Sequence, residues 1–421
     1  TVSITSPTVN GGYHITCNNA NNGVITQTLS GGTLPYSIIW NNGQSTQNLN
    51  NVGAGSYSVI ITDANNCSIN QSIVLTEPET VFASANSPSF YGGYNIKCHS
   101  NSTGTISLGA IGGTTPYTYN WNGPSSFTSS SQNLNNVNAG TYTATVTDMN
   151  NCSFTTTISL TEPAVLASSV SSYTFVGGYN ISCHGLNDGA ITSTVSGGTQ
   201  SYQYNWVGPL GFTSSSQNLN SLVEGSYSLT VTDTNNCVTN NTITLLERSV
   251  LTATLNSGTF VGGYNISCHG NNDGSINVNV AGGTSSYNYL WTASNTYTSS
   301  AQNINTLSAG NYSVTVTDAN NCMVNLSQSL TEPTALKDTM IVSEFLGGYN
   351  LSCFNSNNGT VQLTTTGGTN PYTQVWTGPS SFTSSLTSIS NLAAGSYSVL
   401  ITDANGCVKT ETINLSQPSV L

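Results

Sequence analysis

The sequence has very few charged residues. Only 5% of its 421 residues are charged, against about 25% in an average soluble protein. Sixteen acids oppose four basic side chains and give a formal net charge of −12; the basic residues are Lys97, Arg248, Lys337 and Lys409. Four basic side chains are too few to bind along the phosphate backbone of a nucleic acid. We therefore expect no nucleic-acid partner. The polybasic cluster that binds anionic lipid headgroups is also missing.

The sequence also lacks long apolar runs. No stretch reaches the roughly 18 apolar residues of a transmembrane helix, so we expect no membrane span in this segment. The first five residues do not have the pattern of a signal peptide, so any targeting segment would lie outside this sequence. Low charge with many Ser, Thr and Asn is typical of disorder, but 36% hydrophobic residues, 21 Tyr and 5 Trp predict packed cores instead.

The groups that carry catalysis or bind metals are sparse as well. The four His, at positions 14, 99, 184 and 269, lie in no recognisable nucleophile motif, so we expect neither an enzyme nor a cofactor. Two Cys and at most one His per repeated unit are too few ligands for a structural zinc site, and we expect no bound metal. One Asp recurs in the motif Thr-Asp-x-Asn-(Asn/Gly)-Cys, as Asp63, Asp148, Asp233, Asp318 and Asp403. It fits a calcium loop or an Asx-turn, and the absence of a second carboxylate nearby favours the turn.

What dominates the sequence is a unit repeated five times. Ten Cys and five Trp recur with a period of about 85 residues, which is the signature of a repeat array. The predicted domains are repeat 1 (1–78), repeat 2 (79–163), repeat 3 (164–248), repeat 4 (249–333) and repeat 5 (334–418). Residues 419–421 match 249–251, and we interpret them as the start of a further repeat. Glu77, Glu162, Glu247 and Glu332 lie at repeat boundaries, where we expect junction contacts rather than catalysis.

Each repeat shows the alternation of short β-strands. In repeat 4, Tyr312, Val314 and Val316 alternate with polar residues, and no segment has a helical period. Six or seven such strands predict a small antiparallel, immunoglobulin-like β-sandwich. We expect its core to contain Trp40, Trp121, Trp206, Trp291, Trp376, Tyr57, Tyr142, Tyr227, Tyr312 and Tyr397. The Tyr follows an Ala-Gly or related pair and resembles a tyrosine corner, in which its hydroxyl bonds back to the preceding turn.

Two Cys per small unit at a fixed spacing predict disulfides and an oxidising compartment. We expect pairing within each repeat: Cys17 with Cys67, Cys98 with Cys152, Cys183 with Cys237, Cys268 with Cys322 and Cys353 with Cys407. Such a bridge would stabilise its repeat by about 4 kcal/mol in the chain-entropy model. The pairing depends on strand parity. One strand between the Trp strand and the Tyr strand places both Cys at one end of the sandwich, whereas two strands place them at opposite ends, facing neighbouring repeats.

A loop after the Trp is the candidate contact loop. It is four residues shorter in repeat 1, and it carries Phe127, Phe212 and Phe382 in repeats 2, 3 and 5. Its aromatic residue could touch a neighbour or a ligand, or fold back onto the sheet. The Trp could in principle stack on sugars, but its strand position favours the core.

The whole pattern resembles the SprB repeat family of bacterial surface proteins. The motifs that carry the resemblance are Gly-Gly-Tyr-Asn-Ile-Ser-Cys-His-Gly (262–270), Gly-Gly-Thr-Thr-Pro-Tyr (112–117) and the segment from Ala309 to Cys322. Asn18 and Phe354 depart from the usual His, and Ser201 and Ser286 from the usual Pro. The resemblance implies export by the type IX secretion system in Bacteroidota and display on the outer cell surface. It also implies long filamentous proteins, some of which are gliding adhesins.

We therefore expect an elongated rod that forms the stalk of an extracellular adhesin and carries tension. Its expected partners are the neighbouring repeats of the same chain. Two alternatives remain: the repeats themselves bind surface polysaccharide multivalently, or copies of the chain associate into a multi-chain filament.

Overall fold

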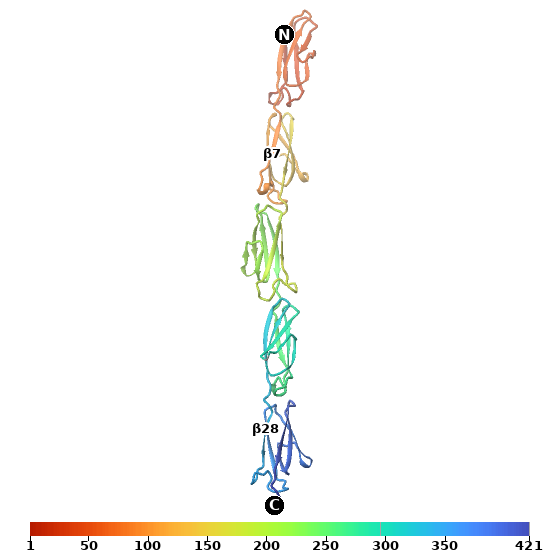
Figure 1. The fold of residues 1–421 in the computed structure, drawn as a ribbon. Coiled ribbons are helices and arrows are strands. Elements are labelled where there is room, and N and C mark those ends of the chain that lie inside the picture. The colour runs from red at the N-terminus through yellow and green to blue at the C-terminus, as the bar shows by residue number, and fades with distance from the viewer. Residues whose placement is uncertain (295, 421) are drawn as a thin grey trace. The chain divides into compact units, whose positions relative to one another are not determined.

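The chain is built from β-strands joined by short turns (Figure 1). The structure is a computed structural model and describes residues 1–294 and 296–420; Leu421, which belongs to the predicted start of a further repeat, lies outside it. No α-helix occurs in the described ranges, and none of their helical turns is long and apolar enough to cross a membrane. The helical turns are 3₁₀ turns: η1 (Asn10–Gly12), η2 (Tyr91–Gly93), η3 (Pro124–Ser126), η4 (Pro209–Gly211), η5 (Val261–Gly263) and η6 (Pro379–Ser381).

The strands fall into five similar sets, one for each predicted repeat. Repeat 1 holds β1 (Val2–Thr5), β2 (Gly23–Leu29), β3 (Ser37–Trp40), β4 (Leu49–Val52), β5 (Gly55–Thr62) and β6 (Ser68–Leu75). Repeat 2 holds β7 (Phe82–Asn86), β8 (Gly104–Ile111), β9 (Thr118–Asn122), β10 (Thr128–Ser129), β11 (Leu134–Val137), β12 (Gly140–Thr147) and β13 (Ser153–Leu160). Repeat 3 holds β14 (Ala167–Ser172), β15 (Gly189–Ser196), β16 (Gln203–Val207), β17 (Thr213–Ser214), β18 (Leu219–Leu222), β19 (Gly225–Thr232) and β20 (Val238–Leu245).

The last two repeats follow the same order. Repeat 4 holds β21 (Thr252–Ser257), β22 (Gly274–Ala281), β23 (Asn288–Ala293), β24 (Thr298–Ser299), β25 (Ile304–Leu307), β26 (Gly310–Thr317) and β27 (Met323–Leu330). Repeat 5 holds β28 (Lys337–Val342), β29 (Gly359–Thr366), β30 (Thr373–Gly378), β31 (Phe382–Ser384), β32 (Ser388–Leu392), β33 (Gly395–Thr402) and β34 (Val408–Leu415).

Each repeat is a sandwich of two antiparallel sheets. In repeat 2 the first sheet has the order β7-β8-β11 and the second β10-β9-β12-β13. Repeat 1 has no counterpart of β10, because its loop after Trp40 is shorter, and each of its sheets has three strands. Buried and exposed residues alternate along the strands, so one face of each sheet meets the other sheet. The expected all-β, immunoglobulin-like class is confirmed.

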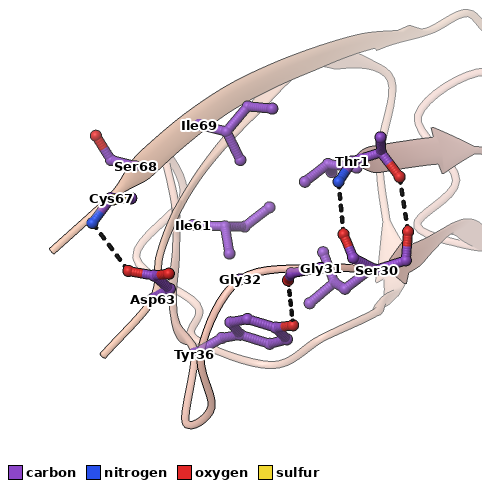
Figure 2. A pocket seen from close by; sticks show the side chains of 12 residues that line it. Thr1, Ser30, Gly31, Gly32, Tyr36, Ile61, Asp63, Cys67, Ser68 and Ile69 are labelled. Carbon is purple, nitrogen blue, oxygen red and sulfur yellow. Dashed lines mark hydrogen bonds between the residues drawn. The ribbon is translucent and has the colours of Figure 1, made fainter. Parts of the chain in front are cut away.

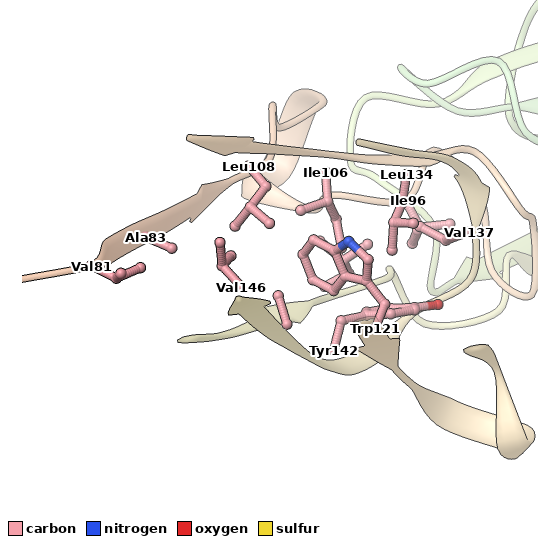
Figure 3. Packing of buried hydrophobic residues seen from close by; sticks show 12 residues of the cluster. Val81, Ala83, Ile96, Ile106, Leu108, Trp121, Leu134, Val137, Tyr142 and Val146 are labelled. Carbon is pink, nitrogen blue, oxygen red and sulfur yellow. The ribbon is translucent and has the colours of Figure 1, made fainter. Parts of the chain in front are cut away.

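The core of each sandwich surrounds one tryptophan. Figure 3 shows the core of repeat 2, where the indole of Trp121 lies between Ile106 of one sheet and Tyr142 of the other. Its Nε1–H donates a hydrogen bond to the Ser131 carbonyl at 3.0 Å, which satisfies the single polar group of the side chain. The five tryptophans are all buried, with at most 1% exposed: Trp40, Trp121, Trp206, Trp291 and Trp376.

The tyrosine of the penultimate strand forms the corner that the sequence predicts. The Tyr142 hydroxyl donates to the Asn138 carbonyl at 3.0 Å, and Tyr57, Tyr312 and Tyr397 make the same bond to the residue four positions upstream. Burial raises the pKa of Tyr142 and Tyr397 above the usual value. These tyrosines therefore stay neutral and tie the turn before the strand to the core.

The aromatic residue of the candidate contact loop folds back onto the sheet. Phe127 packs edge-on against Tyr142 with ring centroids 5.5 Å apart. Phe212 on Tyr227 and Phe382 on Tyr397 repeat this geometry. Of the two alternatives that the sequence left open for this loop, these side chains adopt the packing onto the sheet, because the corner tyrosine offers them an apolar partner.

Contacts divide the chain into two compact units. The first contains Thr1–Ser171, Thr192–Gln217 and Tyr227–Ile243; the second contains Ser172–Ile191, Asn218–Ser226 and the chain from Thr244 on. Repeat 3 contributes to both units. The junctions between repeats 1 and 2 and between repeats 2 and 3 lie within the first unit, and the two remaining junctions lie within the second.

The prediction that cysteines pair within each repeat is wrong. The first Cys of one repeat bonds to the second Cys of the next repeat, in the pairs Cys17–Cys152, Cys98–Cys237, Cys183–Cys322 and Cys268–Cys407. Cys67 and Cys353 are free thiols. These bridges close loops of 135 or 139 residues, instead of the shorter loops within single repeats that we expected.

Strand length explains why a pair within one repeat cannot form. In repeat 1, the His14 and Ile15 amides bond to the Thr76 carbonyl, so the segment that leads to Cys17 lies beside the end of β6. Cys67 lies at the beginning of β6, which has 8 residues and is therefore about 26 Å long. A disulfide requires Cα atoms about 4.4–6.8 Å apart. Each Cys is therefore within reach only of a neighbouring repeat.

Candidate functional site: the inter-repeat junction

The most distinctive residues of the repeat meet where one repeat ends and the next begins. We call this region the junction: the lower half comes from the Gly-Gly turn and first Cys of one repeat, and the upper half from the Gly-Gly-Thr and Asp turns of the next. At each junction the bonded cysteines have Cα atoms 5.6 or 5.7 Å apart. The four junctions share one geometry, which the junction between repeats 3 and 4 exemplifies.

The recurring Asp organises the upper half. Asp318 Oδ1 accepts hydrogen bonds from the Asn320 and Cys322 amides at 2.8 and 2.9 Å, and Oδ2 accepts one from the Thr284 amide at 2.8 Å. The side chain is 2% exposed. Three amide donors occupy the carboxylate and present partial positive charge to it, which suits an anion and opposes a bound cation. The Asx-turn interpretation of this motif is therefore confirmed and the calcium interpretation is not.

An asparagine two residues after this Asp reaches across the junction. Asn320 Nδ2 donates to the Val176 carbonyl of repeat 3 at 3.1 Å, and its Oδ1 accepts from the Val176 amide at 3.1 Å. The same Nδ2 also donates to Thr284 Oγ1 at 3.0 Å. Asn150, Asn235 and Asn405 bind the carbonyls of Asn10, Tyr91 and Val261 in the same way. This asparagine thus binds the backbone of the neighbouring repeat, so the contact does not depend on which side chain the neighbour has at that position.

Two glycines allow this close approach. Gly262, at φ +86°, lies in the lower half of the junction between repeats 4 and 5, and a Cβ on it would be 3.1 Å from Thr369 Cγ2 of the next repeat. Gly282, at φ +71°, lies in an upper half, and a Cβ there would be 2.0 Å from the Val250 carbonyl oxygen. Both positions therefore require glycine, for the left-handed backbone as well as for space.

The linker between repeats is held from both sides. In the second junction, the Thr161 carbonyl accepts from the Asn95 and Ile96 amides of repeat 2, and the Ala164 carbonyl accepts from the Gly198 amide of repeat 3. Only two residues separate these anchors, and Pro163 between them is buried. A linker this short and this well bonded leaves little freedom at the junction.

The Glu of the linker bonds to the segment after the first Cys of its own repeat, beside the junction. Glu247 Oε1 lies 2.6 Å from His184 Nδ1, and its Oε2 accepts from the Gly185 amide at 2.8 Å. His99 with Glu162 and His269 with Glu332 repeat the pair. In repeat 5, Phe354 takes the place of His and Gln417 that of Glu, and the Gln417 carbonyl still accepts the Asn355 amide at 2.8 Å. The contact to the backbone amide is thus common to these repeats, and the contact between His and Glu side chains accompanies it in repeats 2, 3 and 4.

Arg248 takes the place of the linker proline between repeats 3 and 4. Its Nε donates to the Gly283 carbonyl of repeat 4 at 2.6 Å, and Nη1 donates to the Tyr179 hydroxyl of repeat 3 at 2.8 Å. The guanidinium also lies 4.9 Å from the centre of the Tyr179 ring. Arg248 therefore bridges the two repeats where the rigid proline is missing.

The pocket in Figure 2 lies at the upper end of repeat 1 and is lined by Leu29, Tyr36, Ile61 and Ile69 among others. In repeats 2 and 4, Val81 and Leu251 pack over the equivalent Gly-Gly turn and are buried. This space is therefore a packing position of the sandwich, and we assign no ligand to it. The described part of the chain has no group of three or more His, Cys, Asp or Glu side chains that could hold a metal ion.

Sequence reasoning found the cysteines, the Asp turn and the linker Glu, but it missed the asparagine and the threonine of the upper half. Both are common turn residues, so their role is invisible until the neighbour is in place. The available signal was their fixed spacing: in every repeat the asparagine lies 2 residues before the second Cys and the threonine 16 residues after the first Cys.

The asparagine should protect the junction disulfide from reduction. Asn320→Ala removes three hydrogen bonds, each worth about 1 kcal/mol, and should speed reduction of Cys183–Cys322 by dithiothreitol at least about tenfold. Differential alkylation followed by peptide mass spectrometry gives the rate for each bridge. Asn65→Ala is the matched control, because Asn65 bonds Thr33 within repeat 1, far along the chain from Cys183–Cys322. Equal rates in wild type and Asn320→Ala would contradict this role.

The Asp turn should be sensitive to acid. The Thr33 and Cys67 amides hold the pKa of Asp63 below its usual value, so the turn is fully stabilised above about pH 4 and loses this stabilisation as pH falls further. Carbon NMR of the Asp63 carboxyl should show a midpoint below that of a free Asp side chain. The Thr33 amide should shift with the same midpoint, and Asp63→Asn should abolish that shift. A midpoint at the ordinary value would disprove the amide contacts.

The fold and the junction define a class of protein: a tandem array of immunoglobulin-like sandwiches in which each repeat is covalently bonded to the next. The SprB repeat family matches at five places, residues 14–45, 94–126, 179–211, 264–296 and 349–381. The chain therefore contains five SprB repeats, as its motifs predict. Each match begins after the Gly-Gly turn, contains the first Cys and extends past the Trp, but it ends before the Asp turn.

Solved structures resemble the chain only distantly. The tetra-tandem repeat in the extending region of a large adhesion protein is 14% identical, with 80% of this chain and 99% of that chain covered and a TM-score of 0.28. A Ca²⁺-stabilised adhesin that helps an Antarctic bacterium bind ice is 14% identical, with 80% and 98% covered and a TM-score of 0.31. The eight N-terminal immunoglobulin domains of Down syndrome cell adhesion molecule are 10% identical, with 97% and 71% covered and a TM-score of 0.29. These similarities are too weak for an inference about function, and no curated protein matches the sequence.

Proposed function

We propose that this chain is a stalk segment of an extracellular bacterial surface adhesin, which holds an adhesive region away from the cell and carries tension. It is a non-catalytic, structural segment. Its five SprB repeats and its four disulfides, which require an oxidising compartment, support this location. The observation that carries the proposal is the way in which the disulfides interlock.

The interlocked bridges make two covalent routes along the array. One route enters at Cys17, crosses to Cys152, follows the chain to Cys183 and crosses to Cys322. The other crosses from Cys98 to Cys237, follows the chain to Cys268 and crosses to Cys407. Each route passes through the last strand of one repeat and the first strand of the next.

Both routes bypass the middle of each repeat. In repeat 3, the bypassed segment lies between Cys183 and Cys237 and contains most of the sandwich, including the strand of Trp206. A repeat can therefore unfold under load without releasing these residues into the length of the stalk. This resistance to lengthening suits a stalk that must keep a constant length under load. It would be of no benefit to a small binding domain.

The chemistry of the surface agrees with a passive stalk. The outward residues of the second sheet pair with one another, as Thr145 does with Thr155 at 3.3 Å and Thr230 with Asn240 at 2.9 Å. Hydroxyl and amide groups that satisfy one another gain little from a ligand.

The test is adhesion by the fragment itself. Beads coated with the oxidised five-repeat chain should show no more retention on glass, agar or a glycan array than beads coated with an inert protein. A reduced and alkylated chain controls for contacts made by unfolded protein. Specific retention by the folded, oxidised chain would overturn the stalk assignment and support polysaccharide binding by the repeats.

A further inference from the structure

Repeat 5 carries a group of charged side chains where the other repeats have uncharged ones. Lys409 Nζ lies 2.6 Å from Asp338 Oδ1 and 3.1 Å from Glu411 Oε1. Asp338 belongs to β28, and the other two residues belong to β34. Only 5% of the residues in the chain are charged, so three of them in mutual contact need an explanation. We call these residues the charged triad.

The charged triad faces the interior of the sandwich. β28 and β34 are edge strands of the two opposing sheets and lie in contact along one side of repeat 5. Lys409 is paired with Ile401 of β33. Glu411 is paired with Val399, and both of these partners are fully buried. Residues directly opposite one another in an antiparallel pair point to the same face, so the lysine and the glutamate point inward. The Asp338 side chain is only 6% exposed.

Neighbouring repeats have apolar or hydrogen-bonded residues at this place. In repeat 4 the equivalent residues are Ala253, Val324 and Leu326, which pack against the core. In repeat 3, Asn241 Nδ2 of β20 donates to the Ser168 carbonyl of β14 at 2.9 Å. These contacts hold the two sheets together at their edges. In repeat 5 the same contact is made by two carboxylates and one ammonium group, whose removal from water is costly.

The distances suit a reaction between the amine and a carboxyl group. Asp338 Oδ1 has no partner other than Lys409 among the described residues, so Nζ is held beside the Cγ atom that carries this oxygen. Reactants fixed in contact react as if present at about 10⁵–10⁸ M, which favours condensation of an acid with an amine. An amide would also replace two charges by a neutral group, at a place that is apolar in repeat 4.

We propose that Asp338 and Lys409 form an intramolecular isopeptide bond, which joins the first strand of repeat 5 to its last, and that Glu411 carries the protons. Lys409 Nζ attacks Asp338 Cγ, and the new N–C bond forms as one C–O bond of the carboxyl group breaks. Two protons pass from the ammonium group through Glu411 to the departing oxygen, which leaves as water. The ion pair is thereby converted to one amide and one water molecule, and the reaction needs no oxidant or other reactant.

The proton carrier is needed because the amine is protonated. Asp338 and Glu411 raise the pKa of Lys409 above its usual value, and an ammonium group has no lone pair with which to attack. Glu411 Oε1 is 3.1 Å from Nζ, within reach of its protons. The Glu411 side chain is 40% exposed, which leaves it room to turn from the amine to the departing oxygen.

The bond would pass load directly across repeat 5. The disulfide from repeat 4 enters at Cys407, close to Lys409 on the same segment, and Asp338 lies on the strand that follows the linker. The bond would therefore shorten the covalent routes along the chain, and extension measurements of the disulfides alone require Asp338→Ala. This mechanical role rests on the proposed stalk function. The bond itself does not, and it is tested without any measurement of adhesion.

The test is the mass of the intact chain. The folded chain, with its four disulfides formed, is denatured and reduced, and its mass should be lower than the sequence requires by one water molecule. Proteolysis and tandem mass spectrometry should then identify a branched peptide that joins Asp338 to Lys409. A mass equal to that of the sequence would overturn the proposal, as would a loss of water at another position instead.

Two variants of the lysines identify the amine that reacts. Lys409→Arg keeps the positive charge and should show the full mass of its sequence. Loss of water in this variant would indicate cyclisation of the aspartate and contradict the proposal. Lys337→Gln is the matched control, because Lys337 is exposed beside Asp338 on the same strand. It should lose one water molecule as the wild type does, and a full mass in this control would contradict the pairing with Lys409.

Glu411→Gln tests the proton carrier and keeps both reacting groups. The variant should form the bond at least about 100-fold more slowly, as expected when a positioned acid–base group is lost. Both rates come from the intact mass at intervals after cell-free synthesis under oxidising conditions. An unchanged rate in Glu411→Gln would refute the role of Glu411.

Discussion

Pulled from its two ends, the oxidised chain should extend to less than a third of the length that the reduced chain reaches. Through the disulfides alone, residues 1–17, 98–152, 237–268 and 407–420 form a covalent route between the ends that is as short as the route through 1–17, 152–183, 268–322 and 407–420. This route holds about 116 residues, and at about 3.5 Å per residue it allows an extension of about 410 Å, against about 1,470 Å for the whole chain. Single-molecule force spectroscopy before and after addition of a reductant measures both lengths.

Two double variants separate this bridge pattern from any other. Cys98→Ser with Cys237→Ser removes a bridge that only one of the two equally short routes uses, so the final length should stay the same. Cys17→Ser with Cys152→Ser removes a bridge that both short routes use and should lengthen the chain by about 95 Å. Equal lengthening by the two double variants would contradict the interlocked arrangement, because pairs within repeats would all contribute alike.

Replacement of the central tryptophan should unfold one repeat and leave the others intact. Trp291 is fully buried, and its indole N–H bonds the Ala301 carbonyl at 3.0 Å. Trp291→Ala should cost about 4–5 kcal/mol from the cavity and the lost bond, which is much of the roughly 5–10 kcal/mol that holds a domain of this size together. Hydrogen exchange read by mass spectrometry should show lost protection in β22 to β27, while β2 to β6 keep theirs.

Trp291→Phe is the matched control for that experiment. It retains an aromatic ring among Ile276, Val314 and Leu330 and gives up the indole N–H, so the loss of protection should be clearly smaller. Unchanged exchange in Trp291→Ala would show that the tryptophan is not the centre of the core. Equal loss in all five repeats would show that the array unfolds as one cooperative unit instead.

The strands and the core could be predicted because their signal is local. Alternation over a few residues, as in Tyr312, Val314 and Val316, places a strand and decides which face is buried. The Asp turn is local as well, because Asp318 bonds to the amides two and four positions ahead. Its bond to the Thr284 amide, 34 residues upstream, is not local and could not be predicted. The direction of the loop after the Trp could not be predicted from local signals, because Phe127 meets its packing partner Tyr142 only across the sheet.

The disulfide pattern could not be predicted in this way, because it depends on how the chain returns between β9 and β11. These two strands belong to different sheets, and the two-residue strand β10, Thr128–Ser129, lies between them. A strand of two residues has no periodicity to detect. In repeat 1 the chain passes from the sheet of Trp40 to the other sheet without such a strand. Counting strands from the sequence therefore placed Cys67 at the wrong end of the sandwich.

The order in which the chain matures follows from the offset of its bridges. Cys98 bonds to a partner 139 residues further along, so it stays a thiol until the whole next repeat has been made and folded. Oxidation must therefore trail synthesis by one repeat, and the growing end always presents one reactive thiol to its surroundings. A single repeat that fails to fold leaves two thiols unmatched, one in the repeat before it and one in the repeat after it. A misfolded repeat thus leaves a free thiol on each of its correctly folded neighbours, where a quality-control enzyme that recognises thiols can bind it.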